Sequence, residues 1–260
     1  MNPAELLKDS TERFSTRVEN YVRYRPGYPE QILGLLDREC RLAPDSVIAD
    51  IGSGTGLLSE LFLKNGNPVY AVEPNREMRQ AGERSLAAYP EFRSFDGRAE
   101  SIPLEPQSVD FVVAGQAFHW FDRELCRGEF ARILRQSGWV AIIWNTRRMA
   151  GTPFLEAYES LLARYGTDYA AVAHRHVDER EIRAFFAPGA CLLRKFENHQ
   201  VVDFDSLKGR VLSSSYMPEE GDANYQPALA EIRRIFEAHE RGGSVTLEYD
   251  TEVYYGRLEA

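Results

Sequence analysis

One segment, residues 47–56, constrains the fold more than any other part of the chain. It reads Val-Ile-Ala-Asp-Ile-Gly-Ser-Gly-Thr-Gly: an apolar stretch typical of a buried strand, then three alternating glycines, before a helical pattern begins at Leu57. Glycines at a strand-to-helix turn let the backbone curl tightly and let a ligand approach the main chain. A second strand-like stretch ends at Glu73, about 20 positions after Gly52, where a dinucleotide site places its ribose-binding acid. The pattern predicts a β-α-β unit that binds a nucleoside.

The residues around the glycines favour a cationic nucleoside over NAD. The pyrophosphate fingerprint requires a third small residue at the position of Leu57. Asp50 lies just ahead of the glycines, where it would repel a diphosphate. S-adenosylmethionine carries a ribose, an adenine, an ammonium and a sulfonium but no phosphate, and therefore suits these acids. The alternative is a glycine turn that serves only the fold, but Asp50 and Glu73 together favour the cofactor.

Composition limits the classes of partner. The 260 residues can form one or two domains with a large core, and the net charge of −9 disfavours a nucleic-acid backbone as partner. The three cysteines (Cys40, Cys126 and Cys191) lack metal or redox spacing and indicate reduced thiols. No apolar run approaches the length of a membrane span, and no signal-peptide pattern opens the chain. We expect a soluble, cytoplasmic protein.

Strand-like runs alternate with amphipathic stretches, which predicts an α/β fold with a mostly parallel sheet and helices on both faces. The expected strands are residues 47–51, 69–73, 92–95, 109–114, 139–144 and 245–255. Polar residues that suit helix starts precede four amphipathic stretches: Asn75, Asp122, Thr152 and Asp178. The helix after Asp122 carries Leu134 on its apolar stripe and is expected to end at Ser137-Gly138. Period-two alternation in the last strand suggests antiparallel pairing.

The simplest partition is a single domain over residues 1–260. Residues 1–40 form a cover segment ahead of the sheet, broken by the two prolines of the Arg25-Pro-Gly-Tyr-Pro29 run. Amphipathic helices within residues 147–190 arrive where a sixth strand would be expected. We interpret them as an inserted helical lid.

Ligands of an open parallel sheet bind beyond the carboxyl ends of its strands. The segments that follow the expected strands are residues 52–55, 73–75, 97–100, 115–121 and 144–147. With these segments in view, residues 10–146 resemble the type-11 class I S-adenosylmethionine-dependent methyltransferases. Tyr21-x-x-x-Arg25-Pro-x-Tyr-Pro29, Ala-Val-Glu73-Pro-Asn and Gln116-Ala-Phe-His-Trp-Phe121 are similar to a subgroup related to trans-aconitate methyltransferase. The resemblance implies a Rossmann-like seven-stranded sheet with an antiparallel C-terminal strand, and S-adenosylmethionine as cofactor.

The resemblance also implies a set of cofactor residues. They are Tyr21, Arg25, Asp50, Gly52, Ser53, Gly54, Thr55, Gly56, Glu73, Pro74, Asn75, Met78, Ala99, Glu100, Gln116 and Ala117. The glycines would bracket the methionine tail, with Asp50 oriented toward its ammonium through water or backbone, and Glu73 would hold the ribose. Pro74 and Met78 would lie against the adenine, the Ala99 backbone would meet the adenine edge, and Gln116 would contact the sulfonium side. Family members often have Asp where this chain has Arg98, so Glu100 or a backbone carbonyl would accept from the adenine amino group.

Arg25 has two functional interpretations besides a structural one. Its guanidinium suits either the methionine carboxylate or an acidic acceptor, and the alternative is a loop residue that serves only the fold. Tyr21 and Tyr24 share its segment, and one of them could cover the cofactor while the other packs in the core.

His119 is the candidate catalytic residue. Its pKa suits a general base that orients or deprotonates the acceptor, but its aromatic neighbours equally suggest a packed wall around one histidine. The candidate acceptor residues are Tyr24, His119, Trp120, Asn145, Arg147 and Tyr216. The pair His174 and His176 is weak evidence for a metal, and we expect none.

The sequence therefore predicts methyl transfer to an oxygen or carbon of a small molecule, with a carboxylic acid as one option. It lacks the Pro-Cys and Asn-Pro-Pro-Tyr elements of nucleic-acid methyltransferases. A non-catalytic protein that binds S-adenosylmethionine or S-adenosylhomocysteine is the first alternative, and a nucleotide-dependent oxidoreductase is the second. The oligomeric state is not predicted.

Overall fold

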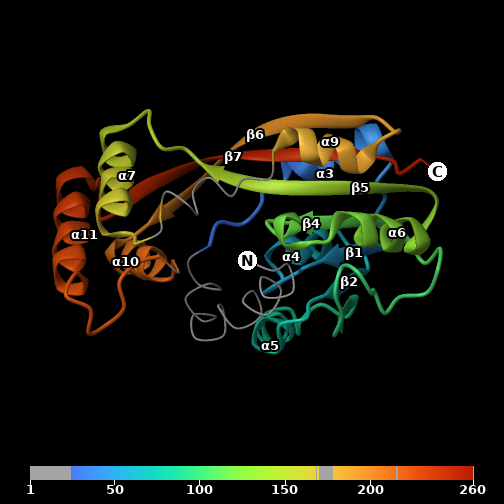
Figure 1. Ribbon diagram of the computed structural model, residues 1–260, viewed down its shortest axis with the longest axis horizontal. Coiled ribbons are helices and arrows are strands. Elements are labelled where there is room, and N and C mark those ends of the chain that lie inside the picture. The colour runs from blue at the N-terminus through green and yellow to red at the C-terminus, as the bar shows by residue number, and fades with distance from the viewer. Residues whose placement is uncertain (1–24, 168, 170–177, 215, 260) are drawn as a thin grey trace.

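A seven-stranded sheet with strand order β3-β2-β1-β4-β5-β7-β6 organises the chain (Figure 1). The structure is a computed structural model and describes residues 25–167, 169, 178–214 and 216–259. The strands are β1 (Ile48–Ile51), β2 (Val69–Val72), β3 (Phe92–Phe95), β4 (Val109–Gly115), β5 (Leu134–Arg147), β6 (Cys191–Val202) and β7 (Val245–Gly256). Neighbours from β3 to β5 pair in parallel, whereas β7 runs antiparallel to both β5 and β6. The predicted mostly parallel sheet with an antiparallel last strand is confirmed.

Helices cover both faces of this sheet, as predicted. The helices of the described chain are α3 (Gln31–Cys40), α4 (Leu57–Lys64), α5 (Arg76–Ser85), the short 3-10 helix η1 (Phe118–Trp120), α6 (Arg123–Ile133), α7 (Pro153–Tyr165), α9 (Glu179–Phe186), α10 (Phe204–Leu212) and α11 (Tyr225–His239). Side chains of α3 and α4 share one buried cluster with Ile48 and Phe111. Those of α6 and α9 share another with Ala49 and Val112, which point to the opposite face because side chains alternate along a strand.

The four predicted helix starts are confirmed by side-chain caps. Backbone N–H groups donate to the side chains of Asn75, Asp122 and Thr152 at 2.9, 3.1 and 3.2 Å. Asp178 forms a capping box with Glu181. Each cap satisfies a backbone donor that the first helical turn leaves without an intrahelical partner.

The predicted end of α6 is wrong. The helix ends at Ile133, and Leu134 is already part of β5, where it pairs with Val109 of β4. Leu134 is buried in the same core as Ile133, so an apolar stripe continues across the boundary although the backbone changes from helix to strand. A register irregularity between Val109 and Phe111 accommodates the early start of β5.

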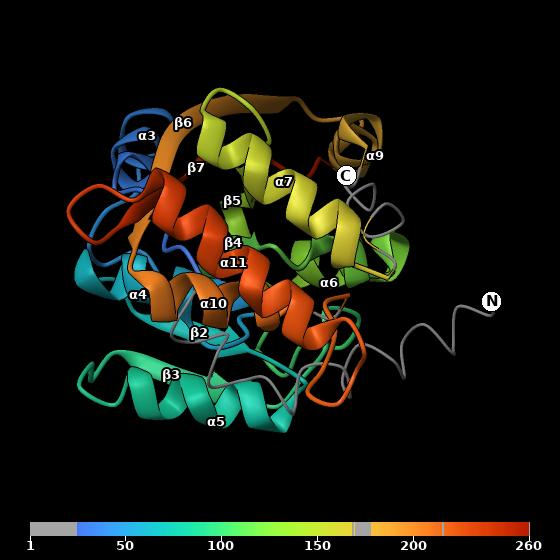
Figure 2. The same ribbon diagram turned by 90° about the vertical axis from the view of Figure 1, so that its left-hand side faces the viewer.

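Three long strands carry a second packing unit. β5, β6 and β7 have 14, 12 and 12 residues, whereas β1, β2 and β3 have four each. The projecting ends of β6 and β7 hold α7, α10 and α11, which cross them as a separate layer (Figures 1 and 2). We call these three helices the helical extension. α9 lies elsewhere, against α6 beside the sheet, and the lid role of residues 147–190 stays a prediction.

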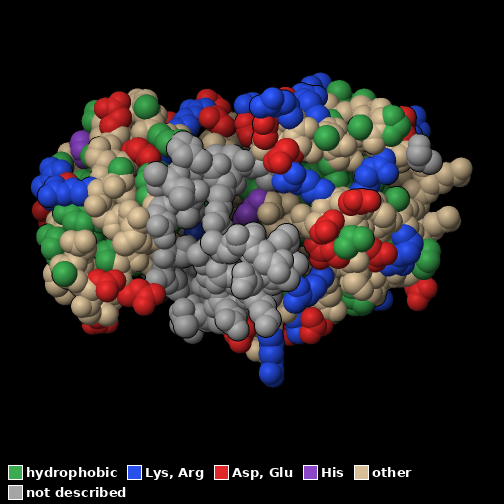
Figure 3. Space-filling view, in the orientation of Figure 1, with side chains coloured by type: hydrophobic (Ala, Val, Ile, Leu, Met, Phe, Trp, Pro, Cys, Tyr) green, Lys and Arg blue, Asp and Glu red, His purple; other side chains and the backbone are tan. Residues whose placement is uncertain are grey.

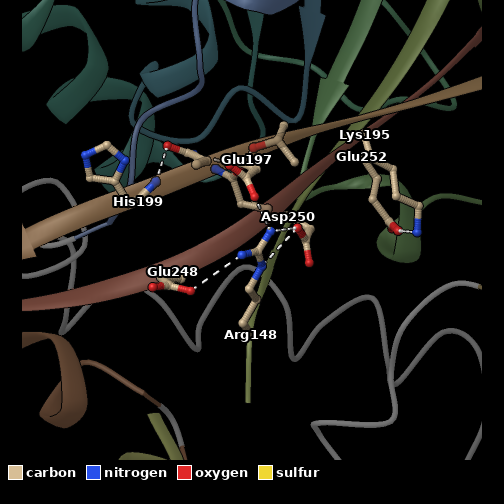
Figure 4. Close-up of polar contacts among 10 residues, drawn as sticks. Arg148, Lys195, Glu197, His199, Glu248, Asp250 and Glu252 are labelled. Atoms are coloured by element: carbon tan, nitrogen blue, oxygen red, sulfur yellow. Dashed lines mark hydrogen bonds and ion pairs between the residues drawn. The ribbon is translucent and has the colours of Figure 1, made fainter. Parts of the chain in front are cut away.

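A charge network ties the long strands together on their solvent side (Figure 4). Glu197 and Asp250 lie directly opposite each other in the β6–β7 pair, where like charges destabilise a sheet. Arg148 lies between them, with Nη2 2.6 Å from Asp250 Oδ1 and 3.2 Å from Glu197 Oε1. A second pair, Lys195 and Glu252, bridges the same strands at 2.5 Å.

Acidic and basic side chains are interspersed over the face shown in Figure 3, so positive charge on that face is spread rather than gathered. Within the described residues, no helix combines the length and the apolar character that crossing a membrane requires.

Candidate active site

The glycine turn after β1 has a backbone that only glycine adopts without strain. Gly52, Gly54 and Gly56 have φ angles of 69°, 57° and 84°. A Cβ atom on Gly52 would lie 2.6 Å from the Cβ of Ala117, and one on Gly56 would lie 2.5 Å from Leu86. The turn therefore packs closely against its surroundings and leads directly into α4.

Glu73 joins this turn to the end of β2. Its Oε2 accepts the N–H of Gly54 at 2.9 Å, and its Oε1 accepts the N–H of Asn75 at 2.8 Å. Burial raises the pKa of Glu73, and these two backbone hydrogen bonds act against that rise. Each carboxylate oxygen keeps a further lone pair, so a carboxylate held in this way can accept two neighbouring hydroxyls, as on a ribose.

Asp50 lies buried beneath the turn. The Ser59 hydroxyl of α4 donates to its Oδ2 at 2.6 Å, while its Oδ1 is buried with no hydrogen-bond partner among the described residues. Burial raises the pKa of this carboxyl from 3.8 to about 7. The hydroxyl of Thr55 is also buried without a described partner. Buried polar atoms are normally satisfied, so these two atoms, the partly exposed backbone of Gly52 and Gly54 and the Glu73 carboxylate fit a polar, cationic nucleoside.

The other residues expected near the adenine are placed as follows. Met78 and Ala99 are buried, and Asn75 caps α5 through the N–H of Met78. Glu100 accepts the N–H of Asp122 at 2.8 Å and so supports the start of α6. Arg98 is exposed and forms a bridge with Ser101.

Gln116 is fixed at the end of β4. Its φ is 58°, an uncommon value outside glycine. Its backbone N–H donates to Ile143 at 3.0 Å, and its side-chain Nε2 donates to the carbonyl of Asn145 at 2.9 Å. Gly115, just before it, lies under Tyr28, whose hydroxyl would be 2.5 Å from an added Cβ. The ends of β4 and β5 and the segment around Tyr28 are therefore in contact.

Three strands hold the chain at Gly27. Nδ2 of Asn145 and Nδ2 of Asn198 both donate to the Gly27 carbonyl, at 3.1 and 2.9 Å. The Thr251 hydroxyl donates to Oδ1 of Asn145 at 2.5 Å, and Asn198 also donates to that oxygen at 3.2 Å. We call Asn145, Asn198 and Thr251 the Gly27 clamp. The clamp fixes the N-terminal segment across the ends of β5, β6 and β7.

His119 lies on η1 among aromatic rings, and its role as a base stays a prediction. Its ring centroid is 4.5 Å from that of Trp120 and 5.4 Å from that of Trp144. His119 and Trp120 are partly exposed, whereas Phe118 is fully buried. The Trp144 Nε1–H is buried with no described partner, so this wall presents a hydrogen-bond donor as well as rings.

Arg147 ends β5 at the base of the helical extension. Its Nη2 lies 2.5 Å from Oε2 of Glu159 and 3.1 Å from the Tyr169 hydroxyl, and its guanidinium carbon lies 4.8 Å from the ring centre of Tyr158. Arg25 and Arg147 both act electrostatically on Tyr216, and burial raises the pKa of Tyr216. The structure thus brings Arg25, Arg147 and Tyr216 together.

Some expected residues lie outside the described part of the chain: Tyr21, Tyr24, His174 and His176. In the described part, no group of three His, Cys, Asp or Glu side chains could hold a metal. Sequence reasoning missed the site roles of Tyr28, Trp144, Asn198 and Thr251. The period-two pattern had placed Thr251 on the covered face of its strand, but nothing local to Asn198 marked it, because its partner Gly27 is 171 positions away.

Comparison with known proteins identifies this arrangement. Residues 49–142, which span the glycine turn, Glu73 and Gln116, match the methyltransferase domain family Methyltransf_11. The matched residues are those of a methyltransferase domain. S-adenosylmethionine is the methyl donor of this domain, and the protein is an enzyme of the methyltransferase class.

Relatives with this domain extend the similarity beyond it. The chain is 28% identical over 252 residues to an uncharacterized methyltransferase-like protein of Schizosaccharomyces pombe, covering 95% of each chain. It is 39% identical over 141 residues to an uncharacterized methyltransferase of Mycobacterium tuberculosis, a match that spans 54% of this chain and 55% of the relative.

Solved structures share the fold at low sequence identity. One described as a type II methyltransferase from Anaeromyxobacter dehalogenans has a TM-score of 0.68 at 22% identity, covering 90% of this chain and 98% of that one. An S-adenosylmethionine-dependent methyltransferase from Aquifex aeolicus has a TM-score of 0.51 at 15% identity, covering 98% of both chains. The Rossmann-like methyltransferase fold is therefore confirmed.

Proposed function

We propose that the protein transfers the methyl group of S-adenosylmethionine to an oxygen or carbon of a small molecule, by direct in-line displacement. The observation that carries the proposal is the pairing of the glycine turn with Glu73, in which Gly54 donates to the carboxylate at 2.9 Å. That pairing joins the ends of two adjacent parallel strands, where ligands of such sheets bind. The net charge of −9 and the three separated cysteines support a small acceptor and a reducing, cytoplasmic setting.

The donor side is built from residues that bind and orient. When bound, S-adenosylmethionine supplies a methyl group carried on a sulfonium. On transfer of the methyl group, the sulfonium becomes the neutral thioether of S-adenosylhomocysteine. The glycine turn would hold the amino-acid tail above the buried Asp50, and Glu73 would accept the two ribose hydroxyls. Gln116, held by the carbonyls of Ile143 and Asn145, would border the sulfonium side.

The acceptor side lies between η1 and the base of the helical extension. In-line positioning of the acceptor against the activated methyl group supplies a large part of the rate enhancement of methyl transfer. A carboxylate acceptor would need no base, whereas a phenol or an acidic carbon would use His119 to take its proton. Two observations support a carboxylic acid among the candidate acceptors: Arg25 and Arg147 lie on the acceptor side, and the sequence resembles the subgroup related to trans-aconitate methyltransferase.

Calorimetric titration with S-adenosylmethionine tests the donor side. Glu73→Gln replaces one acceptor oxygen by an amide NH₂ that would face a backbone N–H, so we expect at least a tenfold loss of affinity. Glu77→Gln, on the exposed face of α5, is the matched control and should bind as the wild type does. Equal binding by both variants would refute the Glu73 assignment.

Acceptor-dependent formation of S-adenosylhomocysteine from a panel of small acids and phenols tests catalysis. Turnover is the expected result. Binding of the donor without turnover across the panel would instead support a non-catalytic binding protein, and a response to NAD would revive the oxidoreductase alternative.

A further inference from the structure

Arginines and tyrosines gather where the long strands meet the helical extension. Arg147 and Tyr249 are direct partners in the β5–β7 register, and the Arg147 guanidinium lies over the ring of Tyr158. From α10, the guanidinium carbon of Arg210 lies 5.3 Å from the ring centre of Tyr249. These four residues come from β5, α7, α10 and β7, so they form a site that exists only in the folded chain. We call them the arginine–tyrosine cluster.

Tyr249 presents a buried hydroxyl to this cluster. The residue is 1% exposed, and its hydroxyl oxygen is buried with no hydrogen-bond partner among the described residues. Burial raises the pKa of Tyr249 to about 12, although Arg210, Arg25 and Arg147 act in the opposite direction. The hydroxyl is therefore a neutral donor at physiological pH. A buried donor of this kind costs free energy until something accepts from it.

The charges around the Tyr249 hydroxyl are positive. Arg25, Arg147 and Arg210 are close enough to act on it electrostatically. Arg147 is balanced by Glu159, whose carboxylate is shared with the hydroxyl of Tyr169 at 2.6 Å. Arg210 is 7% exposed and stacks on the aromatic ring that carries the hydroxyl. A hydroxyl donor beside a buried guanidinium is complementary to an anionic oxygen.

The arginine–tyrosine cluster lies near the proposed acceptor side, because both involve the last residues of β5. Asn145, whose carbonyl holds Gln116, is two residues before Arg147 in β5. Two residues of a strand span about 7 Å. Arg147, the register partner of Tyr249, therefore lies about that distance along β5 from the residue whose carbonyl holds the Gln116 side chain.

We propose that Arg210 and Tyr249 form a subsite for an anionic group, a carboxylate or a phosphate-like group, at the end of the acceptor remote from the methylated atom. The proposal rests on the proposed function, because it assigns the far end of the same acceptor. It adds a specificity requirement: the acceptor carries an anionic group at the end remote from its reacting atom.

Calorimetric titration of the full chain tests the subsite with three probes of similar length, with and without S-adenosylhomocysteine. Adipate and 5-phosphonopentanoate carry an anion at both ends, and hexanoate carries one. The wild type should bind the doubly anionic probes at least tenfold more tightly than hexanoate, because a hydrogen bond to a charged group is lost with hexanoate. Comparison of adipate with 5-phosphonopentanoate shows whether a carboxylate or a phosphate-like group fits better.

Two variants locate the preference. Tyr249→Phe should reduce the preference for the doubly anionic probes over hexanoate about tenfold. It should leave the melting temperature unchanged or raised, because it deletes a buried hydroxyl without a described partner. Arg210→Gln should abolish the preference. Two variants are the matched controls and should keep the preference: Tyr254→Phe and Arg233→Gln. Tyr254 is buried on the opposite face of β7, and Arg233 of α11 lies over the ring of Phe204 in α10.

The outcomes separate this proposal from the proposed function. Equal binding of adipate, 5-phosphonopentanoate and hexanoate by the wild type, or a preference that survives both Tyr249→Phe and Arg210→Gln, would overturn the subsite. Failure of S-adenosylhomocysteine to bind would count against the donor site alone, since the probe preference is also measured without it.

Discussion

Asn145 of β5 and Asn198 of β6 donate to one carbonyl oxygen, that of Gly27, at 3.1 and 2.9 Å. These strands are not neighbours, because β7 runs between them and contributes Thr251 to the same group. Since Asn145 also holds Gln116 through its own carbonyl, the clamp connects the N-terminal segment to the donor side. The Gly27 clamp therefore predicts that residues far from the methyl group affect its transfer.

Asn198→Ala should lower kcat/KM by about fivefold, the effect of one lost hydrogen bond of about 1 kcal/mol. The loss should appear mainly in KM, because Arg25 and Tyr28 would be held less firmly while the glycine turn stays intact. Steady-state kinetics with both substrates measures it. His199→Ala changes the exposed neighbouring side chain and serves as the control. An unchanged KM in Asn198→Ala would show that the clamp does not position the segment.

Asp50 should make the protein without cofactor less stable as pH rises. Its folded pKa of about 7 is above the value of about 4 expected in the unfolded chain. The stability that the neutral carboxyl contributes is therefore full below pH 4 and is lost as pH rises through 7. Asp50→Asn stays neutral, so its advantage in free energy of unfolding should grow from pH 4 to 7 to a few kcal/mol and then level off.

Urea denaturation of Asp50→Asn and the wild type at pH 4, 5.5, 7 and 8 measures this difference. Asp45→Asn, at an exposed loop position, controls for the loss of one negative charge. A difference that does not change with pH would mean that Asp50 is already ionised in the folded protein.

Arg148→Met should destabilise the protein by about 1 kcal/mol at pH 7, because it leaves Glu197 and Asp250 facing each other without a cation. Arg148 lowers the pKa of Asp250. That contribution is present above the unfolded pKa of about 4 and is lost as pH falls through the folded value. Thermal melts should therefore separate the variant from the wild type at pH 7 and converge below pH 4. Lys195→Met, in the simpler pair with Glu252, should cost less.

Gly52→Ala should destabilise the protein by on the order of 1–3 kcal/mol and abolish donor binding, because φ is positive and the added methyl would overlap Ala117. Gly128→Ala is the control. Gly128 lies in α6, and nothing lies within 4 Å of the added Cβ. This variant should stabilise by about 0.5–1 kcal/mol. Melting temperatures and titration with S-adenosylmethionine distinguish the two. Full donor binding by Gly52→Ala would contradict the close approach at this turn.

Local patterns predicted the parts of the molecule that local physics determines. Residues close in the sequence determine the glycine turn, the helix caps at Asn75 and Thr152, and the alternation in β7. The structure contains all of these features. β6 was not located, because an edge strand with exposed Arg194 and Lys195 lacks the apolar run of a central strand.

The unpredicted parts of the candidate site depend on contacts between distant segments. Asn198 meets Gly27 across 171 positions, and Arg210 meets Tyr249 only because α10 folds back over β7. Neither side chain differs locally from an ordinary surface residue, so pattern alone gave no reason to choose it.

The extended strands have a consequence for how such an enzyme can change. β5 and β7 pass without interruption from the half of the sheet beside the glycine turn to the half under α7, α10 and α11. The helices α7, α10 and α11 contribute no residue to that turn. Their sequence can therefore diverge between relatives while the machinery that holds the methyl donor is inherited unchanged.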